Sequence, residues 1–163
     1  MEGVTYDSNT DKLYVVWEKS NDPGVTEQEI RRFDLSTAEL SPGVTPSMND
    51  PFANGVLDSL GLIDLSGLHF NSITNTLLIL SHESDELLEV SPTGTLLSSI
   101  SLTGPNQMSQ PEGVTMGDDG RLYVVGEADE LAIFVGPEPA IPEPSAAALV
   151  IASLAGALRR RRA

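Results

Sequence analysis

Short apolar segments separated by polar turns follow one another along residues 1–136. In the middle of this region the pattern predicts strands at residues 65–71, 77–82, 86–90 and 95–102, joined by turns that contain Asn, Ser, Pro or Gly. The apolar runs are nearly continuous, which is typical of strands covered on both faces. Four short strands in this order predict an antiparallel meander.

A six-residue motif occurs three times. Residues 1–6 (MEGVTY) and 111–116 (PEGVTM) are nearly identical, and residues 66–71 (SGLHFN) form a more divergent copy. Each copy is followed by a polar turn and then an apolar strand. The glycines of the second and third copies, Gly67 and Gly113, are 46 residues apart, which is close to the ~40–50 residues of a propeller blade. The repeat therefore predicts an all-β fold, a partial β-propeller of about three four-stranded meander blades.

Three blades are fewer than the 4–8 of closed propellers. We therefore expect residues 1–136 to be the C-terminal part of a larger propeller, with further blades and a signal sequence encoded ahead of Met1. Residues 40–63 are rich in Pro, Gly, Asn, Ser and Asp, which indicates an irregular insertion in the first unit. Strands of the first and third units are expected near residues 3–6, 13–18, 29–34, 113–116, 121–127 and 131–135.

Composition narrows the classes of function. The chain has 24 acidic against 9 basic residues and a net charge of −15, and so strong a negative charge repels the phosphates of nucleic acids. We expect no nucleic-acid partner. The absence of Cys excludes disulfides, thiolate metal sites and a Cys nucleophile. The sequence contains no phosphate-binding P-loop and no nucleophile-elbow motif.

The C-terminal region is different in character. Residues 137–144 are rich in Pro and predict an extended spacer, and residues 145–158 carry no charge. Fourteen apolar residues are few for a membrane span, which needs about 17–25. The four arginines that follow are typical of the cytoplasmic flank of such a span. We therefore predict a transmembrane helix in residues 145–163, rather than a soluble amphipathic helix, and its flank is Arg159, Arg160, Arg161 and Arg162.

The order of Pro142, Glu143, Pro144, an apolar helix and a terminal Arg cluster resembles the PEP-CTERM sorting signal. The resemblance implies export by a Gram-negative bacterium that makes exopolysaccharide. The tail would hold the protein in the inner membrane until an exosortase processes it, after which the protein would reach the cell surface or be secreted.

The repeated blocks of residues 1–136 are similar to the SdiA-regulated β-propeller family. The resemblance implies a propeller fold, and the biochemical role of the family is poorly defined. The blocks that carry it are residues 2–7 with 11–16, 64–68 with 78–84 and 87–90, and 112–114 with 119–127.

Acidic residues recur at two positions of the repeat, before the first strand and at the end of the second. If these positions meet at one end of the propeller channel, their carboxylates could hold Ca²⁺ through oxygen ligands. We favour the structural alternative, in which each Glu accepts bonds from backbone amides of the next blade. The candidate metal ligands are Glu2, Glu18, Asp64, Glu112 and Glu127.

Two functions are compatible with these features. The favoured one is an exported binding module, without catalysis, for a component of the envelope, the extracellular matrix or the exopolysaccharide. The alternative is a Ca²⁺-dependent propeller hydrolase of the gluconolactonase or paraoxonase type. They differ in whether the carboxylates converge on one point with open coordination.

Overall fold

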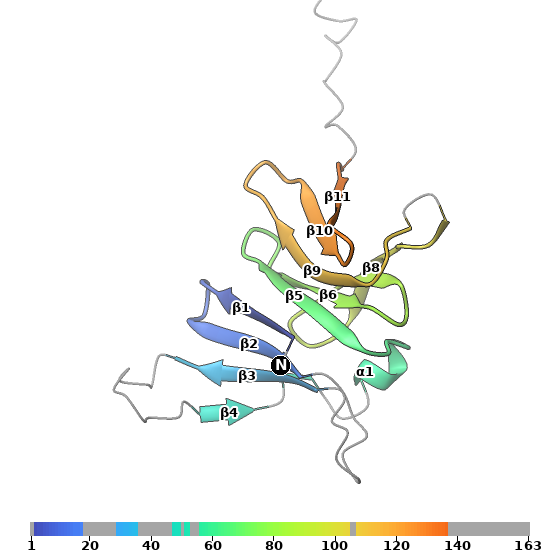
Figure 1. Ribbon diagram of the computed structural model, residues 1–163. Helices are drawn as coiled ribbons and strands as arrows, with labels where there is room; N and C mark the ends of the chain where they lie inside the picture. The colour runs from blue at the N-terminus through green and yellow to red at the C-terminus, as the bar shows by residue number, and fades with distance from the viewer. Residues whose placement is uncertain are drawn as a thin grey trace, which may run out of the picture.

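The computed structural model describes residues 2–17, 29–35, 47–49, 51–52, 56–104 and 107–136 (Figure 1). The predicted spacer, the predicted transmembrane helix and Glu18 lie outside the described residues. The described part of the chain contains no helix with the length and hydrophobicity of a membrane span. It consists of three antiparallel sheets and one four-residue helix, so the predicted all-β class is confirmed for the body.

Blade 1 is a four-stranded sheet in the order β1 (Gly3–Asp7), β2 (Lys12–Trp17), β3 (Glu29–Asp34) and β4 (Ser47–Asn49). The fourth strand lies inside the segment predicted to be an irregular insertion, and that prediction is wrong in this part. Three backbone pairs between β3 and β4 complete the blade.

Residues 51–52 and 56–63 of this segment also belong to the body. It contains the short helix α1 (Val56–Ser59), and Phe52 and Leu62 are buried in the core beside it. Leu57 and Leu60 pack against the same core, so these four apolar side chains attach the segment to the blades.

Blade 2 consists of β5 (Leu65–Asn71), β6 (Thr76–Ser81), β7 (Glu86–Val90) and β8 (Leu96–Ser101), in that order. The four strands and their antiparallel meander agree with the prediction. Every residue of β6 is buried, because this strand has a neighbouring blade on both faces.

Blade 3 contains three described strands, β9 (Pro111–Met116), β10 (Leu122–Gly126) and β11 (Glu130–Phe134), with β10 in the middle. The repeated motif thus forms the first strand of each blade, as predicted.

The three blades pack face to face through two apolar cores. One core joins blades 1 and 2, with Tyr14 and Val16 against Leu68 and Phe70. The other joins blades 2 and 3. The first strands β1, β5 and β9 lie side by side in the middle of the fan (Figure 1). This is the arrangement of consecutive propeller blades around a channel, and it brings the beginnings of these three strands to one end of the body.

Candidate functional site

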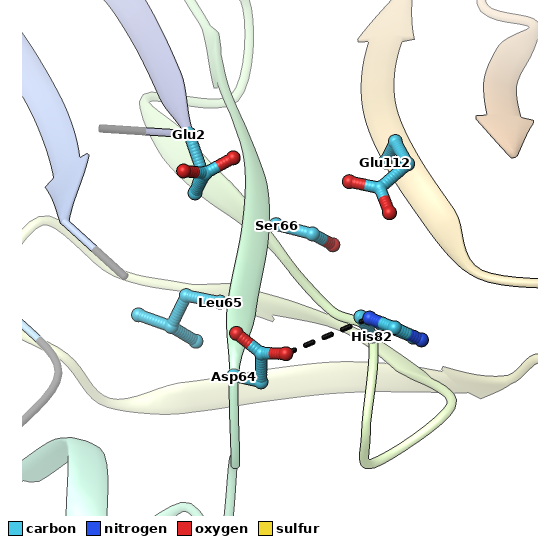
Figure 2. A pocket seen from close by; sticks show the side chains of 6 residues that line it. All are labelled: Glu2, Asp64, Leu65, Ser66, His82 and Glu112. Carbon is cyan, nitrogen blue, oxygen red and sulfur yellow. Dashed lines mark ion pairs between the residues drawn. The ribbon is translucent and has the colours of Figure 1, made fainter. Parts of the chain in front are cut away.

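A hollow of about 150 Å³ lies where β1, β5 and β9 begin (Figure 2). We call it the carboxylate hollow. Five of its six lining side chains are polar, and three of these are acidic. The lining residues are Glu2, Asp64, Leu65, Ser66, His82 and Glu112.

The repeat explains why two of the acids meet here. Glu2 and Glu112 each precede the motif glycine, and Ser66 occupies the same position in blade 2. Because the first strands lie side by side, equivalent positions come to the same end of the body. Figure 2 shows Glu2, just ahead of β1, and Glu112, on β9, with Ser66 between them.

Asp64 lines the hollow from a position outside the repeated motif, in a backbone conformation that Glu2 and Glu112 do not share. It lies just ahead of β5 with a φ of 59°, in the left-handed region that Asp tolerates better than most residues. Its backbone carbonyl accepts a hydrogen bond from the amide of His82, with N and O 2.9 Å apart. The side chains of the two residues also form an ion pair, with 3.5 Å between Oδ2 of Asp64 and Nδ1 of His82.

Ser66 connects two blades beneath the hollow. Its hydroxyl donates a hydrogen bond to the backbone carbonyl of Pro111 across 2.5 Å, and its side chain is buried. Blade 2 is thereby fixed to blade 3 next to Glu112. The hydrogen bond between Ser66 and Pro111 therefore fixes the two blades relative to each other at the hollow.

Three acidic side chains line the hollow, and one of them, Glu112, has a shifted pKa. The pKa of Glu112 is raised above its ordinary value of 4.5, and partial burial is the largest cause. His82 opposes this shift and has the largest effect of any single neighbouring charge, while the negative charges of Glu127, Glu2 and Asp64 each raise the pKa by less. The hollow therefore attracts cations and hydrogen-bond donors.

The five predicted ligands are placed differently. Glu2, Asp64 and Glu112 line the hollow. Glu127 lies outside its lining but near enough to raise the pKa of Glu112. Glu18 belongs to the undescribed residues. Three of the five predicted acids thus share one hollow, and their role as metal ligands stays a prediction.

His82 and Ser66 are residues of the hollow that the sequence analysis did not select. Both hold the repeat positions where the other blades carry Glu: Ser66 matches Glu2 and Glu112, and His82 matches Glu18 and Glu127. Reading each repeat position across all three blades would have found them.

The described residues of the hollow are poorly arranged to coordinate a metal ion. Among the described residues, no three His, Asp or Glu side chains are grouped closely enough to hold one ion. Ca²⁺ needs six to eight oxygen ligands, so the described acids do not form a Ca²⁺ site by themselves. The alternative role, in which each Glu accepts a hydrogen bond from a backbone amide of the next blade, is not seen for Glu112 or Glu127. Within the described part of the chain, neither carboxylate makes such a bond.

Solved structures with the same architecture include two enzymes. One is a luciferin-regenerating enzyme, with 14% identity and a TM-score of 0.56, matched over 77% of this chain and 36% of its own. The other is a gluconolactonase from Xanthomonas campestris, with 17% identity and a TM-score of 0.52, matched over 81% of this chain and 36% of its own. The present chain thus spans about a third of the length of each. At these identities the likeness concerns the fold, which is a β-propeller. The sequence profile of the family described as SdiA-regulated matches residues 1–134, and the chain therefore belongs to the SdiA-regulated family.

Proposed function

We propose that this propeller belongs to an exported, surface-sorted protein and that its carboxylate hollow binds a component of the envelope or extracellular matrix without catalysing a reaction. The observation that carries the proposal is the meeting of Glu2, Asp64 and Glu112, from three consecutive blades, at one open polar hollow. Carboxylates accept hydrogen bonds from sugar hydroxyls and attract bound cations. An exopolysaccharide that carries cations fits this chemistry.

The hydrogen bonding of the hollow argues against a hydrolase of the Ser–His type at this site. A hydrolase of the Ser–His type needs a serine hydroxyl that gives its proton to the histidine. The Ser66 hydroxyl donates to the carbonyl of Pro111 instead, and the His82 ring faces Asp64. The described lining thus offers hydrogen-bond acceptors and negative charge, with no serine activated by a histidine.

The binding proposal is tested with the full chain and the extracellular polysaccharide fraction of an exopolysaccharide-producing Gram-negative bacterium. We expect Glu112→Gln to weaken binding by about tenfold, equivalent to ~1.4 kcal/mol. The matched control is Glu83→Gln, because Glu83 is exposed and lies outside the hollow. Biolayer interferometry measures both. Equal binding by the two variants, or none by the unaltered chain, would contradict the proposal.

A Ca²⁺-dependent hydrolase of the gluconolactonase or paraoxonase type is the second candidate. It is favoured by the three acidic side chains that line the hollow and by the fold shared with a gluconolactonase. The test is release of acid from glucono-lactone with Ca²⁺ or with a chelator, together with thermal denaturation under the same conditions. Ca²⁺-dependent turnover would replace the binding proposal, whereas Ca²⁺-dependent stability without turnover would leave a cation-assisted binding site.

Sorting is the remaining part of the proposal, and its support is the sequence of the tail. The Pro-Glu-Pro motif at residues 142–144, the apolar residues 145–158 and the four terminal arginines have the order of an exosortase signal. In this proposal the membrane holds the tail until processing, and an exosortase-type enzyme is the processing partner.

A further inference from the structure

Two residues of the carboxylate hollow are the extra residues of β-bulges. In blade 2 the pairing of β5 with β6 shifts between Leu65 and Gly67 and leaves out Ser66. In blade 3 the pairing of β9 with β10 leaves out Glu112 in the same way. A bulge re-aims the side chain of its extra residue, and bulges are common next to functional sites. Both extra residues line the hollow, so the same bulge in two blades directs one side chain of each blade toward it.

Blade 2 differs from its neighbours at this position. Blades 1 and 3 carry Glu2 and Glu112 there, whereas blade 2 carries Ser66. The side chain of Ser66 brings no charge, and its hydroxyl donates a hydrogen bond to the backbone carbonyl of Pro111. Figure 2 shows Ser66 between the two acids. The acids of the motif therefore lie on two sides of the hollow, with an uncharged gap between them.

The hollow is larger than a single metal ion needs. One water molecule requires at least ~10–15 Å³ of cavity, whereas the hollow measures about 150 Å³. The acids are also spread out, since no three described His, Asp or Glu side chains are close enough to hold one ion. A ligand that fits must therefore contain several atoms and reach carboxylates on separate strands.

The lining of the hollow accepts hydrogen bonds and carries negative charge. Three of its six described residues are acidic, and none is Lys or Arg. A primary ammonium group has three N–H donors, a positive charge and no acceptor. Its hydrogen bonds to carboxylates are roughly twice as strong as those between neutral groups. An ammonium group on an organic ligand therefore suits this lining, whereas Ca²⁺ needs six to eight oxygen ligands.

The polarity of the lining favours an amino sugar over a lysine side chain. Lysine carries its ammonium group on a stem of four carbons, which packs along apolar surface. The apolar residue of the described lining is Leu65, and its exposed fraction is 0%. A sugar ring instead surrounds the ammonium group with hydroxyl groups, which donate to the carboxylate oxygens that the ammonium group leaves unused.

We propose that the carboxylate hollow binds an amino sugar through its primary ammonium group, and that Ser66 leaves the gap that admits the sugar ring. This inference rests on the proposed function, because it names the unit of an extracellular polysaccharide that the hollow binds. That unit is a hexosamine without an N-acetyl group. Acetylation removes the positive charge and two of the three N–H donors, so the hollow discriminates against the acetylated sugar.

The first experiment compares two ligands that differ only in acetylation. They are a water-soluble oligomer of glucosamine and the corresponding oligomer of N-acetylglucosamine. Isothermal titration calorimetry with the full chain in a mild detergent measures both affinities. We expect the glucosamine oligomer to bind about tenfold more tightly, because hydrogen bonds to a charged group contribute more than neutral ones. Salt should reduce this preference, since it screens the attraction.

Glu112→Gln removes the charge of one lining residue and keeps an oxygen acceptor. It should weaken the glucosamine oligomer about tenfold and leave the N-acetylated oligomer nearly unaffected. Glu83→Gln is the matched control, because it removes one negative charge at an exposed position outside the hollow. An equal loss in both variants would mean that the net charge of −15 attracts the ligand and the hollow does not bind it.

Ser66→Glu tests the gap. It gives blade 2 the residue of the other two blades, so it should fill the gap and abolish binding of the glucosamine oligomer. It also adds a carboxylate, so Ca²⁺ should raise the melting temperature of this variant more than that of the unaltered chain. Ser66→Ala loses only the hydrogen bond to Pro111 and should retain binding. Circular dichroism checks that both variants are folded. Equal binding by Ser66→Glu and the unaltered chain would contradict the role of the gap.

Failure of this inference is distinguishable from failure of the proposed function. If the chain binds the extracellular polysaccharide fraction but binds both oligomers equally, the hollow does not recognise an ammonium group and the inference is overturned alone. An oligomer of lysine that binds more tightly than the glucosamine oligomer, and loses binding with Glu112→Gln, would replace the amino sugar by a basic peptide. If the polysaccharide fraction and both sugar oligomers all fail to bind, both proposals are overturned.

Discussion

Gly67 of blade 2 lies directly against Gly113 of blade 3. A Cβ atom on Gly67 would be 3.3 Å from the Cα of Gly113 and 3.3 Å from the side chain of Leu80. Gly3 has the same relation to blade 2, since its Cβ would be 3.2 Å from the amide nitrogen of Leu68. The glycine of the repeated motif therefore permits the close approach of neighbouring first strands, which in turn brings the beginnings of these strands to the hollow.

Gly67→Ala should destabilise the body. The added methyl group meets the backbone of Gly113 on one side and a buried leucine on the other, and overpacking of this kind costs about 1–3 kcal/mol. Urea denaturation followed by circular dichroism measures the change. Gly136→Ala is the matched control, because no atom lies within 4 Å of its added Cβ. An equal effect of both substitutions would contradict close packing of the first strands.

The acid sensitivity of the fold should depend on His69. Burial lowers the pKa of His69 below its ordinary value of 6.5, and its Nδ1 lies 3.4 Å from the hydroxyl oxygen of Thr115. A lowered pKa means that its contribution to stability is present above pH 6.5 and is lost as the pH falls through the folded-state pKa. His69→Thr introduces the residue of the other two blades and should reduce this loss. Thermal denaturation between about pH 8 and pH 5 tests it.

The control for His69 is the other histidine. His82→Gln leaves His69 in place and should preserve the part of the acid loss that His69 causes. If His69→Thr and the unaltered chain lose stability in parallel below pH 6.5, the burial of His69 does not govern the acid response.

Glu112 should have the opposite pH profile. Its raised pKa means that its ionised form is disfavoured in the folded state, so stability falls as the pH rises from 4.5 through the folded-state pKa. Glu112→Gln removes this penalty and should raise the melting temperature at neutral pH, with the difference vanishing below pH 4.5. Glu83→Gln serves as the comparison. A gain from Glu112→Gln that is largest in acid would be inconsistent with this account.

The terminal arginines should hold the tail on the cytoplasmic side. Moving one charge across the membrane potential costs about 2.3 kcal/mol per 100 mV, so four arginines strongly resist translocation. Replacing Arg159, Arg160, Arg161 and Arg162 by Ser should release unprocessed protein from a host that has an exosortase. Mass spectrometry of the C-terminal peptide distinguishes the processed from the unprocessed protein.

A result against sorting is equally clear. In the unaltered protein we expect the chain to end near Pro142, Glu143 and Pro144 after processing. If the exported protein retains Arg162 and Ala163, the tail is an anchor without processing.

The local pattern of apolar and turn residues was sufficient to predict most of the strands, but not β4. The strands of blade 2 were predictable because apolar runs and turn residues alternate within each short segment. Strand β4 was missed, since residues 47–49 lie in a Pro- and Gly-rich stretch and pair with β3 only through the folded blade. Pairing with a distant partner overrides local composition there.

The sequence by itself determined which positions are equivalent, because the repeated motif places Glu2 and Glu112 at the same position in two blades. Only the tertiary structure decided that Asp64 and His82 join them, because this depends on the left-handed turn at Asp64 and its bond to the amide of His82. The distance between side chains of different blades is set by the packing of whole sheets, and no short stretch of sequence encodes it.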